Sequence, residues 1–260
     1  MTSANAEAGT ERAVEINRAY YGHMAPGQDD YWNRMAAPRF RVKTILRLVE
    51  EIAPLRLADL GCGNGRLLAE IAKRHSVTEL AGVDLSLPQI EANRQRQPHT
   101  EWYCLNLDTS IAQPTEAVPR FDVVVASEII EHLDRPDIFL RNARGLAVPW
   151  TGRLILSTQS GPIGETERRV GHRRHFERAE MVNLLNAAGW KPLRVWNCGY
   201  PFHDLSKWYA NRNADASMRR FGAGAYGPLE KLVCYALRAA FLLNSQQRGT
   251  QLFALARLAE

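Results

Sequence analysis

Short apolar runs alternate with helically spaced apolar positions through the middle of the chain. Runs such as Val123–Val125 and Leu154–Leu156 are typical of strands that are covered on both faces. Between the runs, apolar residues recur every three or four positions, as in amphipathic helices. The pattern predicts strands over 57–60, 79–83, 102–105, 121–126 and 153–157, and helices over 38–52, 65–75, 87–97 and 136–147. This alternation predicts an α/β fold with a doubly wound sheet.

The last third of the chain departs from this alternation. It predicts a helix over 178–188, strands over 191–198 and 249–258, and helices over 203–211 and 229–243. Residues 200–247 are too many for a hairpin turn, so we expect a helical insertion before the last strand. Its second helix has an apolar stripe that includes Leu229, Leu232 and Val233. We expect this stripe to pack in the core or in a homodimer, with an acceptor pocket or a membrane surface as alternatives.

The N-terminal part has its own pattern. A helical pattern over 11–21 is followed by an aromatic-rich loop over 20–32, which includes Tyr21 and Tyr31. Tyrosine rings can line the pocket of a cation, so we expect this loop to be a lid over a ligand. The predicted division is residues 1–38 as an N-terminal helix and lid, and residues 39–260 as the principal domain.

Composition and charge narrow the class of protein. Hydrophobic residues make up 45% of the chain and charged ones 23%, which is typical of a globular enzyme. The net charge is +5, but only five of the 33 basic residues are lysines, so we expect no nucleic-acid partner. The cysteines show no CxxC spacing and no signal peptide precedes them, which favours free thiols in a cytoplasmic protein. The longest apolar run, 232–243, is shorter than the roughly 20 residues of a transmembrane segment.

A glycine-rich turn follows the first predicted strand. Gly61, Gly63 and Gly65 occupy alternate positions between that strand and a helix that starts at Arg66. Glycine adopts positive φ without strain and has no Cβ to hold a ligand away from the backbone. The amides at the start of the helix favour a carboxylate or phosphate. The turn therefore predicts a site for a nucleotide or nucleoside cofactor.

An acid at the end of the second strand sharpens this prediction. Asp84 lies 84 − 65 = 19 residues after Gly65, the spacing at which a carboxylate accepts hydrogen bonds from both ribose hydroxyls. That spacing fits NAD and an adenosyl cofactor equally. The loop is GxGxG rather than GxGxxG, and Asp59 would repel a pyrophosphate but would suit a cationic group. Asn106 and its neighbours follow the third strand, where an acceptor for the adenine amino group is expected.

The motifs together resemble one known family. They are Ala58-Asp-Leu-Gly-Cys-Gly-Asn-Gly65, Gly82-Val-Asp-Leu-Ser86, Asn106-Leu-Asp108 and Phe121-Asp-Val-Val-Val-Ala-Ser-Glu128. In this order they resemble a class I S-adenosylmethionine-dependent methyltransferase of the small-molecule group that includes the ubiquinone-pathway O-methyltransferases. The resemblance covers about residues 39–258. It implies a Rossmann-like seven-stranded sheet with an antiparallel last strand, and S-adenosyl-L-methionine as the cofactor.

The resemblance also implies roles for individual residues. Asp59 and the glycine loop would surround the methionine end, Asp84 would hold the ribose, and Leu85, Leu107 and Asp108 would contact the adenine. The expected cofactor-binding residues are Tyr21, Asp59, Gly61, Cys62, Gly63, Asn64, Gly65, Asp84, Leu85, Asn106, Leu107, Asp108 and Ser127. Glu128 and His132, after the fourth strand, would face the sulfonium and the acceptor.

Chemistry at the acceptor requires positioning and, for a hydroxyl, a base. Alignment of the donor and the acceptor supplies about 7–11 kcal/mol in such displacements. A histidine with a pKa near its usual value of about 6.5 suits a hydroxyl acceptor. Our hypothesis is that His132 or His175 is the base and that Glu128 assists, with His172 as a third candidate. The expected acceptor is a small biosynthetic metabolite, and a nitrogen acceptor stays open.

Two other functions are compatible with the sequence. Glu128, Glu131 and His132 with a later histidine also resemble the metal-dependent methyltransferases of small-RNA 3′ ends, and arginines near 168–174 would meet phosphates. Neither an RNA-binding module nor an RNP1 motif is visible, so we assign no metal ligands and no RNA. A membrane-peripheral lipid-quinone O-methyltransferase is the other alternative. A cofactor-binding sensor without catalysis is the least favoured function.

Overall fold

The structure is a computed structural model that describes residues 29–74, 77–109, 118–221 and 225–259. Within them the elements follow in the order α2 (Asp29–Arg34), α3 (Ala36–Ile52), β1 (Arg56–Leu60), α4 (Arg66–Ala72), β2 (Glu79–Asp84), α5 (Leu87–Arg96), β3 (Glu101–Cys104), β4 (Val123–Ser127), η1 (Ile130–His132), α6 (Pro136–Leu146), β5 (Arg153–Gln159), α7 (Glu165–Arg169), α8 (Arg178–Ala187), β6 (Trp190–Cys198), α9 (Phe202–Arg212), α10 (Ala214–Phe221), α11 (Pro228–Phe241) and β7 (Gln251–Leu258). Every strand and helix predicted within these residues is present, with boundaries that differ by a few residues. The predicted helix over 11–21 lies outside the described residues.

The seven strands form one sheet in the order β3-β2-β1-β4-β5-β7-β6. The strands from β3 to β5 pair in parallel. Strand β7 lies between β5 and β6 and is antiparallel to both. The predicted seven-stranded sheet with an antiparallel last strand is therefore confirmed, as is the helical insertion that precedes this strand.

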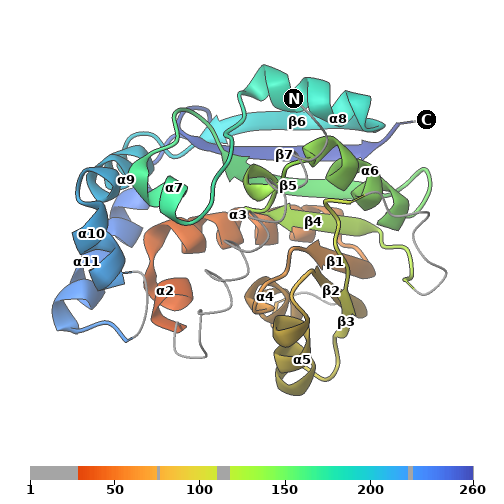
Figure 1. Cartoon of the computed structure of the whole chain (residues 1–260), viewed down its shortest axis with the longest axis horizontal. Coiled ribbons are helices and arrows are strands. Elements are labelled where there is room, and N and C mark those ends of the chain that lie inside the picture. Colours follow the sequence, from red (N-terminus) through yellow and green to blue (C-terminus); the bar gives the residue numbers. More distant parts are fainter. Residues whose placement is uncertain (1–28, 75–76, 110–117, 222–224, 260) are drawn as a thin grey trace, which may run out of the picture.

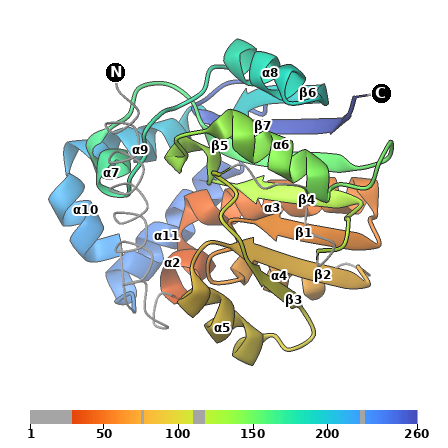
Figure 2. The same cartoon turned by 45° about the vertical axis from the view of Figure 1, so that its right-hand side comes forward.

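Two hydrophobic clusters cover the two faces of the sheet. On one face, Val124 and Leu156 pack with residues of α6 and α8 such as Phe139 and Leu185. On the other face, strand residues such as Val125 pack with residues of α3, α4 and α5. Figure 2 shows α6 and α8 on the opposite side of the sheet from α3. Successive strand residues thus enter opposite cores, which explains why these strands are apolar throughout.

The helical insertion stands at one end of the sheet. Helices α9, α10 and α11 gather beside α7 and α2, away from α5 and β3 (Figure 1). Contacts tie α9 to the carboxyl end of β5 and to the start of β7: Lys207 donates to Gln159, and Asp204 accepts from Thr250. Because ligands of open α/β sheets bind beyond the carboxyl ends of the strands, the insertion is placed to shape such a site.

Some local expectations differ from the structure. Residues 29–32 of the predicted aromatic loop lie in α2. The division at residue 38 stays a prediction, and that residue lies within α3. The apolar stripe predicted on α11 is buried only in part: its last residue, Phe241, is 5% exposed, whereas Leu229 is 57% exposed and Leu232 65%. Cys234, outside that stripe, is buried as well, so the side of α11 that packs is only partly the one that the periodicity predicted. Among the described residues, no helix is long and apolar enough to cross a membrane.

Candidate functional site

The glycine turn after β1 is held by the backbone of the neighbouring strand. The amides of Gly61 and Cys62 both donate to the carbonyl oxygen of Val83, at 2.7 and 3.1 Å. Gly61 has φ +73°, and a Cβ there would overlap the side chain of Ile129. Gly63 has φ +48° and faces open space, because a Cβ there would meet no atom within 4 Å. The turn thus needs glycine at residue 61 for packing, and at residue 63 it presents bare backbone to a cavity.

The rest of the turn connects it to α4. Gly65 is the N-cap of α4 at φ 70°, and the side chain of Asn64 accepts a hydrogen bond from the amide of Arg66 at 3.3 Å. The thiol of Cys62 is buried in the core, and burial raises its pKa well above the usual value. Of these residues, Cys62 therefore has only its backbone to offer to a ligand.

Asp84, at the end of β2, organises the edge of the same cavity. Its Oδ2 accepts from the amide of Gly63 at 2.8 Å, and its Oδ1 accepts from the amide of Ser86 at 2.9 Å. Burial raises the pKa of Asp84, although the hydrogen bonds from Ser86 and Gly63 oppose this effect. A carboxylate has about four lone-pair sites, so Asp84 retains capacity for the hydroxyls of a ligand.

Asp59, in β1, is a buried acid that lies close to Asp84. Its exposed fraction is 3%. Burial, followed by the charge of Asp84, raises the pKa of Asp59 to about 8. The side chain is therefore mostly protonated at neutral pH. A cationic group placed beside it would lower this pKa and would be stabilised in return.

A cavity collects many of the predicted residues. It has ≈ 510 Å³ of empty space, part of it open to solvent, and it is lined by Gly61, Val83, Asp84, Leu85, Leu105, Asn106, Leu107, Asp108, Ile129, His132, Leu133 and Asp134. The segments that follow β1, β2 and β3 therefore meet at one cavity. His132 also lines it, which places the segment after β4 beside this cavity.

Two of the lining residues have structural partners of their own. The carboxylate of Asp108 accepts from the amides of Asp134 and Arg135, at 3.1 and 2.8 Å, immediately before α6. Asn106 accepts from the amide of Asp108 at 3.0 Å. Asn106 thus shapes the loop after β3, and Asp108 connects that loop to the residues before α6. Leu107 is 5% exposed and also belongs to the core.

Glu128 follows β4 in an unusual backbone conformation, with φ 53°. Non-glycine residues at positive φ are uncommon and cluster at functional sites. Its carboxylate accepts from Gln159 at 3.0 Å and from Gln251 at 2.9 Å, and Arg41 lies 3.7 Å away. Although burial alone would raise it, the charge of Arg41 and these hydrogen bonds lower the pKa of Glu128 to about 2. Glu128 is therefore a fixed negative charge.

Ser127 precedes this acid and is linked to the next strand. Its hydroxyl lies 3.0 Å from the hydroxyl of Ser157, which in turn donates to Glu128 at 3.1 Å. Ser127 thus belongs to the hydrogen-bonded network around Glu128. Ser127 is not among the described residues that line the cavity beside His132.

A second acid and two imidazoles form a cluster beside Glu128. Ligand atoms of Glu131, His132 and His172 all lie within 4.8 Å of one another. Glu131 is fully buried, and burial, followed by the charge of Glu128, raises its pKa well above the usual value. Burial also lowers the pKa of His132 to about 4 and that of His172 to about 2. Burial therefore disfavours the charged form of all three groups.

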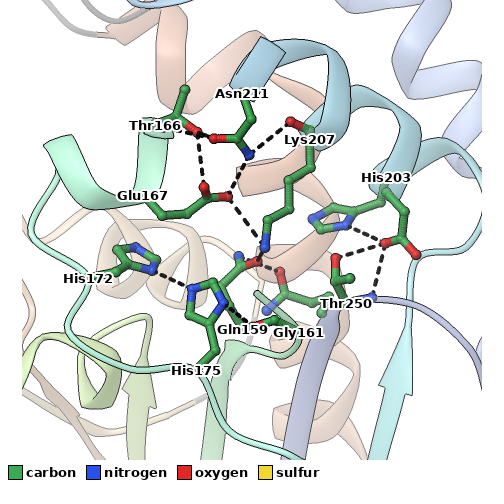
Figure 3. Close-up of polar contacts among 12 residues, drawn as sticks. Gln159, Gly161, Thr166, Glu167, His172, His175, His203, Lys207, Asn211 and Thr250 are labelled. Carbon is green, nitrogen blue, oxygen red and sulfur yellow. Dashed lines mark hydrogen bonds and ion pairs between the residues drawn. The ribbon is translucent and has the colours of Figure 1, made fainter. Parts of the chain in front are cut away.

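His175 continues this cluster away from the cavity. Its Nε2 lies 2.9 Å from Nδ1 of His172, and its Nδ1 lies 2.9 Å from the carbonyl oxygen of Gly161 (Figure 3). Burial lowers the pKa of His175, so its ring is neutral too. Both of its nitrogens are engaged within the protein, unlike those of a base that is open to a substrate.

Sequence reasoning missed several polar residues of this region. Arg41 comes from α3, Gln159 ends β5 and Gln251 begins β7. Lys207 of α9 donates to Gln159 at 2.9 Å and lies 3.4 Å from Glu167 (Figure 3). A glutamine at the end of an apolar strand was a readable signal for Gln159 and Gln251. No comparable sequence signal marks Arg41 or Lys207, because basic residues on the polar faces of helices are common and look alike in sequence. Tyr21 lies outside the described residues.

The chain is similar to known methyltransferases in sequence. The methyltransferase domain family matches residues 58–154. A ubiquinone biosynthesis O-methyltransferase of Ruegeria pomeroyi is 32% identical over 214 residues, which cover 75% of this chain and 83% of that protein. One of Coxiella burnetii is 27% identical over 143 residues, and the match spans 50% of this chain and only 56% of that relative.

The fold is similar to solved methyltransferase structures. An N-methyltransferase of Bradyrhizobium japonicum, in complex with S-adenosyl-L-homocysteine, aligns with a TM-score of 0.58 and 15% identity, covering 94% of this chain and 99% of that one. At this identity the likeness concerns the fold alone. The order of the strands in the sheet and the extended match to the Ruegeria pomeroyi protein agree with this likeness of fold. The chain belongs to the class I S-adenosylmethionine-dependent methyltransferases.

Proposed function

We propose that this protein transfers a methyl group from S-adenosylmethionine to a hydroxyl group of a small molecule. The observation on which this rests is the cavity that Gly61 of the glycine turn and Asp84 line together with His132. A donor seated against the turn would meet an acceptor at the Glu131, His132 and His172 cluster. The names of the two O-methyltransferase relatives support an oxygen acceptor.

The cofactor would be held by the predicted residues. Asp84 would accept from the ribose hydroxyls, and Leu85 and Leu107 would contact the adenine. Asp59 would face a cationic group of the methionine end, because its raised pKa makes it responsive to positive charge. The cofactor supplies a methyl group bonded to a positively charged sulfur, and its transfer leaves S-adenosylhomocysteine. The open space at Gly63 fits such a ligand.

His132 would take the hydroxyl proton in this scheme. It is 6% exposed and is the histidine that lines the cavity. Its lowered pKa keeps the ring neutral and able to accept a proton at neutral pH. Glu128 would stay ionised and would stabilise positive charge nearby. His175 would position His172 rather than touch the acceptor, because both of its nitrogens are engaged.

Cofactor binding tests this function most directly. We expect Asp84→Ala to weaken S-adenosylhomocysteine binding by about 10- to 150-fold, since a hydrogen bond to a charged group contributes about 1.5–3 kcal/mol. Calorimetric titration measures the change, and Glu50→Gln on exposed α3 surface is the control. Wild-type affinity in Asp84→Ala would contradict the proposed site. A panel of phenols, sugars and amines with labelled cofactor then tests the choice of a hydroxyl.

A second candidate is a methyltransferase whose acceptor is lipid-soluble and reached at a membrane surface. It is favoured by the apolar residues that α9, α11 and the two positions after α11 expose: Leu205, Trp208, Leu229, Leu232, Leu242 and Leu243. Flotation with anionic liposomes tests it. Leu232→Ser should reduce flotation without changing S-adenosylhomocysteine binding, and absence of the wild-type protein from the lipid fraction would reject it.

A further inference from the structure

Two histidines of the acceptor side lie on a loop that is closed at its base. Residues 161–175, which we call the histidine loop, follow β5 and contain α7. The amide of Phe176 donates to the carbonyl oxygen of Gln159 at 2.9 Å, and Nδ1 of His175 lies 2.9 Å from the carbonyl oxygen of Gly161. The two ends of the loop are therefore fixed to each other, and the position of α7 depends on what holds the middle of the loop.

Helix α7 takes its cap from another helix. Its N-cap residue is Gly164, which has no side chain to accept a hydrogen bond. The Oδ1 atom of Asn211, in α9, accepts from the amide of Thr166 at 2.8 Å instead. Thr166 is the second residue of α7, and its amide is one of those that an N-cap side chain ordinarily satisfies. Asn211 therefore caps α7 from the helical insertion.

The other contacts of Asn211 fix the direction of its carboxamide. Nδ2 donates to Oε1 of Glu167 at 3.2 Å and to the carbonyl oxygen of Lys207 at 3.1 Å (Figure 3). A Cβ on Gly164 would lie 2.3 Å from the carboxamide, so the absence of a side chain there lets Asn211 approach α7. The backbone of Gly164, at φ −87° and ψ −175°, is accessible to any residue. Gly164 is thus required for its size and not for its conformation.

The backbone of α7 continues into the first histidine of the loop. The amide of His172 donates to the carbonyl oxygen of Glu167 at 2.9 Å. The Glu167 side chain is buried, and its carboxylate lies 3.4 Å from the ammonium of Lys207. Because a buried carboxylate needs donors, Asn211 and Lys207 hold Glu167 against α9. A displacement of α7 would therefore move the main chain at His172.

The hydrogen bonds of His175 fix the tautomer of His172. The carbonyl oxygen of Gly161 can only accept, so Nδ1 of His175 carries the proton in that bond. Burial lowers the pKa of both histidines, which favours neutral rings. Nε2 of His175 then accepts, and Nδ1 of His172 donates to it at 2.9 Å. The ring of His172 in turn packs edge-on against that of His132, with 4.7 Å between their centroids.

We propose that Asn211 is a positioning residue for methyl transfer: by capping α7 it holds the histidine loop, and with it the ring of His172, against His132. This inference rests on the proposed function for its role in the reaction. Asn211 acts through the loop and does not itself touch the acceptor. The helical insertion thereby sets the geometry of the acceptor side. A misplacement of about 1 Å that arises far from the reacting atoms costs about 100-fold in rate.

Nitrogen NMR of the full chain tests the positioning without any turnover. Long-range ¹H–¹⁵N spectra distinguish protonated from unprotonated imidazole nitrogens, and His172→Gln and His175→Gln assign the signals. In the wild-type protein both rings should carry their proton on Nδ1, and Asn211→Ala should replace this pattern with averaged signals of exchanging tautomers. The control is Asn213→Ala, because the exposed Asn213 follows the same helix but donates to Tyr209 within it. This control should keep the wild-type tautomers.

A double-mutant cycle separates positioning from a general loss of stability. Gly164→Ala should displace the Asn211 carboxamide and lower kcat by about 10- to 100-fold, as Asn211→Ala does, with the acceptor that the panel identifies. In Asn211→Ala the added methyl group has room, so Gly164→Ala should then change kcat less than about threefold. Calorimetry should show nearly unchanged S-adenosylhomocysteine binding in every variant, since the cofactor-binding residues lie on other segments.

The outcomes separate this inference from the proposed function. It is overturned if the wild-type rings lack their Nδ1 protons, if Asn211→Ala keeps the wild-type tautomers or the wild-type kcat, or if the effects of Gly164→Ala and Asn211→Ala on kcat multiply. A wild-type protein that binds S-adenosylhomocysteine but methylates no hydroxyl would reject the proposed function. The change of tautomers in Asn211→Ala would then still establish that Asn211 positions the histidines.

Discussion

The two sides of the cavity are built in different ways. The cofactor side is made by the segments that follow β1, β2 and β3, whose backbone amides and acids bond to one another within a short stretch of chain, as Asp84 does with Gly63. The acceptor side joins Arg41, Glu128, Gln159 and Gln251, which come from α3, the end of β4, and β5 and β7. The first side depends on backbone conformation, and the second on side chains that only folding brings together.

The difference has consequences for substitution. A change in the turns should alter cofactor affinity and folding together, since the same hydrogen bonds shape both. A change in the acceptor cluster should alter turnover and leave cofactor affinity nearly intact, since those side chains come from other segments than the predicted cofactor-binding residues. The predictions that follow test this separation.

The largest effect is expected at His132. We expect His132→Ala to lower kcat by about 10²- to 10⁴-fold, the usual contribution of a residue that assists proton transfer. The dissociation constant of S-adenosylhomocysteine should change less than about threefold, because the ring lies on the acceptor side. Steady-state kinetics and calorimetry measure the two quantities. An equal loss in both would show that the two sides are not separable.

A smaller effect, on both binding and stability, is expected at Gly61. Positive φ costs an alanine about 1–2 kcal/mol, and overlap with the Ile129 side chain adds about 1–3 kcal/mol. We expect Gly61→Ala to lower the free energy of unfolding by the sum of these terms and to weaken cofactor binding. Urea denaturation measures the stability. Gly63→Ala is the matched variant, because it meets no atom and should lose only the first term.

The smallest effect is a pH dependence from Asp59. Burial and the charge of Asp84 raise the pKa of Asp59 in the folded protein to about 8, from an ordinary value of 3.8. The free protein should therefore lose stability as the pH rises from about 4 to about 8, because the folded state holds a proton that the unfolded state releases. A cationic ligand lowers this pKa, so its binding should strengthen by up to about tenfold per pH unit and level off above about pH 8.

Calorimetric titration of S-adenosylhomocysteine between pH 6 and 9 (roughly two units below and one above the Asp59 pKa) measures this dependence. Buffers of different ionisation enthalpy report the released proton. In Asp59→Asn both the slope and the proton release should disappear. A slope that persists in this variant would assign the dependence to another group.

Local chemistry in the sequence accounts for much of the fold and of the cofactor side. Buried parallel strands are apolar throughout, and the apolar runs of β4 and β5 reveal them without further information. The spacing of Gly61, Gly63 and Gly65 and the acid at residue 84 are constraints within one turn, so they are readable in order along the chain. Helix α11 shows the limit of this reading, because periodicity identified the helix and the buried Phe241 but did not predict that Leu229 and Leu232 are exposed.

The tertiary structure alone decided the acceptor side. Nothing local distinguishes Arg41 from other arginines of a helix, and only packing brings it 3.7 Å from Glu128. The sequence named Glu131, His132, His172 and His175 as residues of interest, but their order along the chain could not say which nitrogen faces which partner. The hydrogen bonds that join the Gly161 carbonyl, His175 and His172 determine which nitrogen faces which partner. The tautomer of a histidine depends on its neighbours in space rather than in sequence.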